Sequence, residues 1–197
     1  MKTSIKTIFA TGLIALATIS SATVYAVNPV NETSVSASAV KISSINKLKI
    51  SGNVEVTIIQ NSKSNVLYTN EGNEDVSVKK VGSSIYVSSK NKNQAGKITI
   101  YVDDIYRIEA SENASVLANN LLTLKYLQVY ITDNAYVKLN AKTENLYTAI
   151  TGSSKLDLKG STDLYTINMD KSSKISLNRF QSKQTDMQSS VYVANRD

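Results

Sequence analysis

The sequence contains no cysteine, no histidine and no tryptophan, and its single proline is Pro29. Without histidine, the Ser-His-Asp and Cys-His arrangements of nucleophilic enzymes, the common zinc sites and the most frequent general base are excluded. Without cysteine, disulfide bonds and lipid attachment through a cysteine thiol are excluded. So little proline is unusual for a globular fold rich in turns, but it suits repeated strands that turn on Gly, Asn and Ser.

The first 26 residues have the pattern of a secretory signal peptide. Lys2 and Lys6 provide a basic start, residues 8–19 are mostly apolar, and residues 24–26 (VYA) offer a cleavage site. The apolar stretch is too short and too rich in Thr and Ser for a comfortable membrane span, which needs about 20 residues. We therefore expect an exported protein, periplasmic, on the cell surface or secreted, with no integral membrane segment after cleavage. An uncleaved N-terminal anchor is the alternative.

Charge is spread along the chain. Lys and Arg number 22 and Asp and Glu number 16, so the formal net charge is +6. The sequence has no basic run, which would be the usual footprint of a nucleic-acid-binding protein. We therefore expect no nucleic-acid partner and interpret the charge as a solvated mixed surface.

Apolar and polar residues alternate with period two from Ile45 onward, for example over residues 54–58, 98–102 and 127–131. Val, Ile, Thr and Tyr fill these segments, and Gly, Asn, Asp and Ser separate them, which is typical of strands. No window shows a sustained helical spacing with caps, so we predict an all-β protein. Residues 27–44 are predicted to be a flexible leader and residues 45–197 a single domain.

A turn motif recurs about every 20 residues through this domain, with clear copies at residues 51–56 (SGNVEV) and 151–156 (TGSSKL). Such a period with two short strands per unit is typical of a solenoid, in which each turn of the chain stacks on the last around one core. We therefore predict a β-helix with turns of about 20 residues. A β-sandwich of short antiparallel strands is the alternative. Residues 61–102 are the least regular part, and residues 81–84 have the composition of a hairpin turn.

Equivalent positions of stacked turns would lie above one another. The third position of the motif would form a polar ladder at one corner, made of Asn53, Asn73, Asn113, Asn134, Ser153 and Ser172. An inward apolar column would consist of Val56, Val76, Val116, Val137, Leu156 and Ile175. Asn and Ser accept turn geometry and hydrogen-bond the nearby backbone, so we interpret the ladder as structural. A ligand-binding ladder is the alternative.

The string INKLKISGNVEVTI at residues 45–58, followed by VLY at residues 66–68, resembles the opening of the head GIN domain family. The copy TGSSKLDL at residues 151–158 is similar to the repeated turns of that family. These domains are described as head domains of autotransporter adhesins and occur mainly in Bacteroidetes. The resemblance implies a pectin-lyase-like right-handed β-helix without conserved catalytic residues and with a role in cell adhesion. The chain departs from the family where Glu112, Asp133 and Lys171 replace the turn glycine.

Tyrosine is the most suggestive residue type for binding. The candidates in outward positions are Tyr126, Tyr130, Tyr136 and Tyr147. Exposed tyrosines could form a flat amphipathic face for a polysaccharide or a cell-envelope protein. The alternative is that tyrosine simply suits a half-exposed strand.

Catalysis is the competing function. Glycoside hydrolysis needs two carboxyl groups across the scissile bond. Asp103 and Asp104 are adjacent and would point to opposite faces of a strand, whereas Glu112 and Asp133 share a repeat position in exposed turns. We therefore expect no catalytic, cofactor-binding or metal-binding residues, although a glycan-cleaving β-helix enzyme and a purely structural envelope component stay open as alternatives.

The end of the predicted stack shows no capping segment after a degenerate copy of the turn motif at residues 187–192. An exposed terminal strand offers unpaired backbone groups to another chain. We therefore expect self-association through this end, with fraying as the alternative.

Overall fold

The computed structural model describes residues 45–61, 68–70, 75–91 and 93–189, and within them every regular element is a β-strand. The predicted signal peptide and flexible leader lie outside the described residues. The strands are β1 (Lys47–Gly52), β2 (Val54–Gln60), β3 (Tyr68–Asn70), β4 (Val76–Val81), β5 (Ser84–Ser89), β6 (Gly96–Val102), β7 (Arg107–Ala110), β8 (Ser115–Ile131), β9 (Tyr136–Ile150), β10 (Lys155–Met169) and β11 (Lys174–Ser189). The all-β prediction is confirmed.

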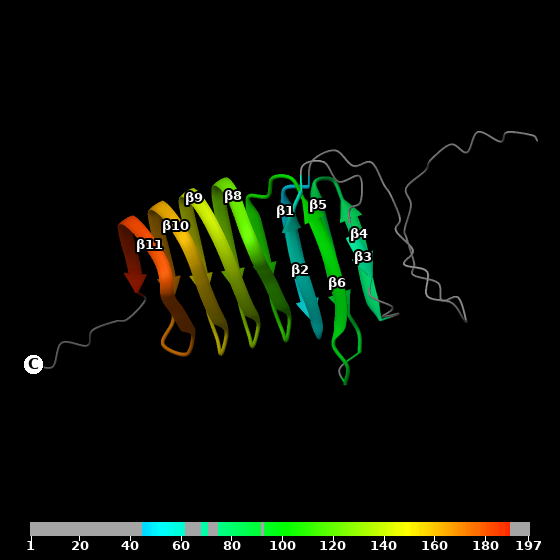
Figure 1. Cartoon of the computed structure of the whole chain (residues 1–197). Coiled ribbons are helices and arrows are strands. Elements are labelled where there is room, and N and C mark those ends of the chain that lie inside the picture. The colour runs from blue at the N-terminus through cyan, green and yellow to red at the C-terminus, as the bar shows by residue number, and fades with distance from the viewer. Residues whose placement is uncertain (1–44, 62–67, 71–74, 92, 190–197) are drawn as a thin grey trace, which may run out of the picture.

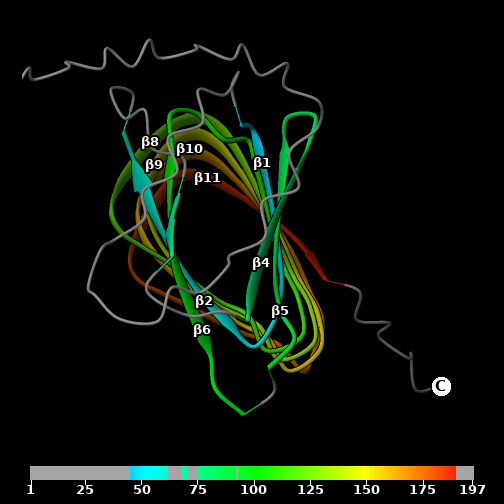
Figure 2. The same ribbon diagram turned by 90° about the vertical axis from the view of Figure 1, so that its right-hand side faces the viewer.

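Strands β8 to β11 lie parallel to one another and in register along most of their length. Figure 1 shows them side by side as successive tilted turns, and Figure 2, which looks along the stack, shows them curving around the same axis. Among the described strands, eight pairs are parallel and only β3–β6 and β4–β5 are antiparallel. A sandwich of short antiparallel strands therefore fits this sheet less well than stacked turns.

Parallel pairing in register aligns the apolar side chains of successive strands in the core. The residues directly paired across six strands, in the order β6, β2, β8, β9, β10 and β11, are Ile98, Val56, Val116, Val137, Leu156 and Ile175. All of these are buried except Ile175 of the last strand, which is partly exposed. Because alternate residues of a strand face opposite sides, the same period places the polar residues between them outside.

The order of the turns differs from the order of the sequence. Strand β1 lies between β5 and β7, and β2 lies between β6 and β8, so the first turn of the domain is inserted between two later ones. The expectation that Val76 belongs to the inward column is therefore wrong. Val76 is buried in β4 opposite Ser89, and Ile98 takes the place next to Val56. The predicted hairpin turn is confirmed, because Val81 pairs with Ser84 across β4 and β5.

The corners of the stack are tight turns. Gly52, Glu112, Asp133 and Gly152 occupy equivalent corners, and all four have positive φ angles. A side-chain hydrogen bond links the two acidic corners, because the Asp133 carboxylate accepts the backbone N–H of Glu112 at 2.9 Å. The fifth corner is built differently: Lys171 is not among the residues with positive φ, and the Asp170 carboxylate accepts N–H groups of Ser172 and Gly152 at 3.0 and 2.8 Å.

Strand β11 is the edge of the described sheet and pairs with β10 alone. Its inward side chains therefore lack a covering turn in the part of the chain that the structure describes, and Met187 is 62 % exposed. Within the described residues, no helix is long and apolar enough to cross a membrane.

Candidate binding face

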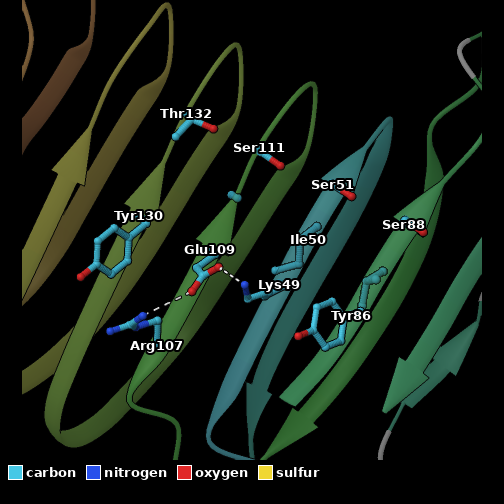
Figure 3. A pocket seen from close by; sticks show the side chains of 12 residues that line it. Lys49, Ile50, Ser51, Tyr86, Ser88, Arg107, Glu109, Ser111, Tyr130 and Thr132 are labelled. Carbon is cyan, nitrogen blue, oxygen red and sulfur yellow. Dashed lines mark hydrogen bonds and ion pairs between the residues drawn. The ribbon is translucent and has the colours of Figure 1, made fainter. Parts of the chain in front are cut away.

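Parallel pairing also aligns outward side chains in rows along the stack. One row, from β5 through β1 and β7 to β8, consists of Tyr86, Lys49, Glu109 and Tyr130. The row beside it consists of Lys47, Arg107, Gln128 and Tyr147. We call these eight residues the Glu109 face. Along its rim, as Figure 3 shows, four hydroxyl side chains follow one another: Ser88, Ser51, Ser111 and Thr132.

An open groove of about 630 Å³ lies on this face. Figure 3 shows the Glu109 side chain near its centre, with Lys49 on one neighbouring strand and Tyr130 on the other. The Lys49 ammonium lies 5.7 Å from the centre of the Tyr86 ring, so the groove has an aromatic residue near each end. Charged, hydroxyl and aromatic side chains from four strands thus meet on one surface.

Glu109 is the electrostatic centre of the face. Its carboxylate lies 3.0 Å from the Lys47 ammonium, 2.9 Å from the Lys49 ammonium and 3.5 Å from the Arg107 guanidinium. Partial burial alone would raise the pKa of Glu109, but hydrogen bonds to Lys49 and Lys47 and their charges outweigh it and lower that pKa. The same hydrogen bond raises the pKa of Lys49. With three cations and one anion, the cluster has a net positive charge.

Arg107 joins the charged cluster to the tyrosines. Its Nε and Nη2 atoms donate hydrogen bonds to the Gln128 side-chain oxygen at 2.9 and 2.6 Å. Its guanidinium carbon lies 4.8 Å from the centre of the Tyr130 ring, a cation–π distance. The rings of Tyr130 and Tyr147 are 5.7 Å apart at an interplanar angle of 48°. The guanidinium and the two rings are therefore held in place by one another.

The four predicted tyrosines do not share one surface. Tyr130 and Tyr147 contact each other on the Glu109 face, and Tyr126, which is 52 % exposed, points to the same side of β8. Tyr136 lies beyond the corner, on a different side of the stack, and pairs with Ser115 and Lys155.

The charged half of the face was not predicted from the sequence. Lys49 and Glu109 each stand two residues before the first residue of a turn motif, at Ser51 and Ser111. Aligning the copies at this position would have placed them in one row. Their direct contact, however, depends on β1 lying beside β7, which the order of the sequence does not indicate.

The described members of the predicted polar ladder occupy successive corners, and Asn73 lies outside the described residues. The Asn134 side-chain amide donates a hydrogen bond to the Asn113 side-chain oxygen at 3.4 Å. The Ser153 and Ser172 side chains line a second groove with Tyr136. The ladder thus consists of a hydrogen-bonded part and a part that opens to the surface.

The acidic candidates do not converge. Asp103 and Asp104 lie in an exposed loop after β6, and Glu112 and Asp133 lie in neighbouring corners. The described part of the chain contains no group of three or more acidic, cysteine or histidine side chains that could hold a metal ion.

These features define a class of protein: an all-β domain whose parallel strands stack in register and present rows of outward side chains. Residues 44–191 match the family described as "Putative auto-transporter adhesin, head GIN domain", and the chain belongs to this family. The resemblance inferred from residues 45–58 and 151–158 is therefore confirmed. No curated protein sequence matches the chain.

Several solved structures share the fold at low sequence identity. A "putative adhesin" from Bacteroides fragilis is 15 % identical, with a TM-score of 0.64 over 76 % of this chain and 73 % of its own. A "putative lipid binding protein" from Parabacteroides distasonis is 13 % identical, with a TM-score of 0.58 over 76 % of each chain. A "putative adhesin" from Parabacteroides merdae is 16 % identical, with a TM-score of 0.54 over 76 % of this chain and 75 % of its own.

Proposed function

We propose that this protein is a non-catalytic adhesion domain, exported to the cell surface or envelope, that binds polysaccharide through the Glu109 face. The observation that carries the proposal is the tyrosine pair Tyr130 and Tyr147 with Arg107 packed against it. Membership in a family of adhesin head domains and the likeness to two structures described as adhesins support the adhesive role.

The chemistry of the face suits a sugar polymer. Aromatic rings offer flat apolar surfaces to the C–H faces of sugar rings, and their hydroxyl groups hydrogen-bond at the edge. The hydroxyl row from Ser88 to Thr132 and the Gln128 amide provide further donors and acceptors beside the rings. Since the rows run along the stack, an extended polymer could contact several strands at once.

We also infer that the stack is a right-handed β-helix solenoid. The in-register parallel pairing of β8 to β11 and the curvature seen in Figure 2 support a coil. Connections between parallel strands of one sheet are right-handed in the great majority of proteins. A crystal structure at side-chain resolution would test the handedness directly.

Self-association through β11 is a further part of the proposal. The outer edge of β11 carries no strand within the described residues, and Met187 is exposed beside it. A second copy that paired with this edge would cover both features. Sedimentation over a wide concentration range would test this, and a strict monomer throughout would contradict it.

A glycan array combined with analysis of reaction products tests the function. We expect specific retention of one class of polysaccharide with no shortening of the chains. Cleaved products would instead support a glycan-cleaving enzyme. A protein that binds no glycan yet stays with purified envelope would be a structural component, and selective binding to lipid vesicles would favour the function named for the P. distasonis neighbour.

A further inference from the structure

A second groove lies at the corner that precedes β9, β10 and β11. Its volume is about 720 Å³, and its lining residues are Asn134, Tyr136, Ser153, Lys155, Ser172 and Lys174. No acidic side chain lines it. None of its residues belongs to the Glu109 face, so it is a separate site.

The two lysines of this groove occupy directly paired positions. Lys155 of β10 is in register with Lys174 of β11 and with Tyr136 of β9. Paired strands are about 4.8 Å apart, so the two side chains leave the sheet side by side and in the same direction. Like charges at such a distance repel each other, and a bound anion would remove that repulsion.

Neither ammonium group, that of Lys155 or that of Lys174, forms an ion pair within the described residues, whereas Lys97, Lys125 and Lys183 each pair with a carboxylate at 3.8, 3.9 and 2.8 Å. The nearest acidic neighbour along β10 is Asp157, whose charge adds to the effect of burial in raising the pKa of Tyr136.

The wall of the groove supplies neutral donors and an aromatic surface. The side-chain hydroxyls of Ser153 and Ser172 make no hydrogen bond within the part of the chain that the structure describes, although their neighbours Ser154 and Ser173 bond to backbone carbonyls. Tyr136 is partly buried at the opposite side of the groove. The two serine hydroxyls therefore lie beside the two lysines without a hydrogen-bond partner among the described residues.

We propose that this groove is a second binding site, specific for an anionic polysaccharide that carries sulfate, phosphate or carboxylate groups. Lys155 and Lys174 hold one anionic group between them through charge-assisted hydrogen bonds. The hydroxyls of Ser153 and Ser172 donate to its remaining oxygens, and the Tyr136 ring packs against the adjoining sugar.

Binding to dextran sulfate, polygalacturonate and neutral dextran, measured by surface plasmon resonance at low ionic strength, tests the proposal. The double variant Lys155→Gln/Lys174→Gln should bind at least one of the two anionic polymers about tenfold more weakly. The control Lys79→Gln/Lys80→Gln removes the same charge from β4, at the other end of the stack, and should keep its affinity within about twofold. The milder Ser153→Ala variant should weaken binding about threefold, because it removes one donor.

Equal losses in both double variants would show a general charge effect and overturn the proposal, as would unchanged binding in the groove variant. Retention on anionic lipid vesicles through the same lysines, without binding to either anionic polymer, would also overturn it in favour of a membrane surface. The Tyr130→Ser variant separates this site from the Glu109 face, because it should leave binding to the anionic polymer in the second groove intact.

Discussion

The guanidinium of Arg107 lies 4.8 Å from the ring centre of Tyr130, its neighbour one strand further along the stack. This contact fixes the aromatic surface of the Glu109 face against its charged cluster. We expect Tyr130→Ser to weaken binding of the polysaccharide held by the Glu109 face about tenfold, since it removes the ring that contacts both Arg107 and Tyr147. Binding of anionic polymers in the second groove should not change.

Glycan affinity chromatography of the variant measures this effect. Tyr101→Ser is the matched control, because Tyr101 lies on β6 and outside the Glu109 face, and it should leave the affinity unchanged. Equal retention of the Tyr130 variant and the unaltered protein would show that the Glu109 face takes no part in binding.

The ion pairs of Glu109 make stability depend on pH. The pKa of Glu109 is lowered in the folded protein, so its stabilising effect is present above the unfolded pKa of about 4.3 and is lost as the pH falls through the folded pKa. We expect Glu109→Gln to lower the free energy of unfolding by about 1–2 kcal/mol at pH 7. Urea titrations should show this difference shrinking below about pH 4.

Glu55→Gln is the control for that experiment. Glu55 and Lys97 form a longer and more exposed ion pair at 3.8 Å. Its removal should cost no more than about 0.5 kcal/mol. A difference for Glu109→Gln that stays constant down to pH 2 would contradict the assignment.

Gly160 is a position in β10 where no other residue fits. Its φ angle is +101°, and an added Cβ would collide with the backbone oxygen of Ala141 on β9. We expect Gly160→Ala to destabilise the protein by about 3 kcal/mol or more, because backbone strain and a clash combine. The midpoint of urea unfolding measures the loss.

Gly82 offers a matched comparison for this substitution. It also has a positive φ, +59°, but an added Cβ would meet no atom within 4 Å. Gly82→Ala should therefore cost only about 1 kcal/mol, the strain of the left-handed conformation alone. Similar losses at both glycines would mean that the close approach of β9 and β10 contributes little.

Thr148 and Tyr165 form a buried hydrogen bond of 3.0 Å between neighbouring strands. Tyr165→Phe leaves the Thr148 hydroxyl buried without this partner, so we expect a loss of about 1–3 kcal/mol. The double variant Tyr165→Phe/Thr148→Val should recover part of it, and a double-mutant cycle measures the coupling. If the loss of stability in the double variant equalled the sum of the two single losses, the hydrogen bond would be contradicted.

The ionisation of Tyr165 makes the stability of the fold depend on pH in the alkaline range. Burial raises the pKa of Tyr165 to about 12, although the hydrogen bond to Thr148 opposes this rise. The raised pKa favours the neutral form in the folded protein, so stability is complete below the unfolded pKa of about 10 and is lost as the pH rises towards 12. The Tyr165→Phe variant should not show this part of the loss of stability at alkaline pH.

The alternation of apolar residues and the recurring turn motif predicted the class of the fold. They also placed Val56, Val116 and Val137 in one inward column, and the structure pairs these three residues directly. These features are local, because a period of two and a turn every 20 residues or so can be read within one window.

The position of Val76 could not be read in this way. It belongs to β4, which pairs antiparallel with β5 and does not lie beside β2. The Glu109 face was missed for a related reason. Tyr86 and Lys49 become neighbours only because a later segment returns to the outer side of β1. Strand order is set by the packing of distant segments, and a pattern within one segment carries no information about it.

The inserted position of β1 has a consequence for folding during synthesis. Leu48 pairs with Ile85 on one side and with Ile108 on the other, and both partners are made later than β1 itself. A chain that leaves the ribosome N-terminus first cannot place β1 between its two neighbours until the segment up to β7 has followed. Contacts of such sequence separation also slow folding. The topology therefore delays completion of the first turn until β7 has been synthesised.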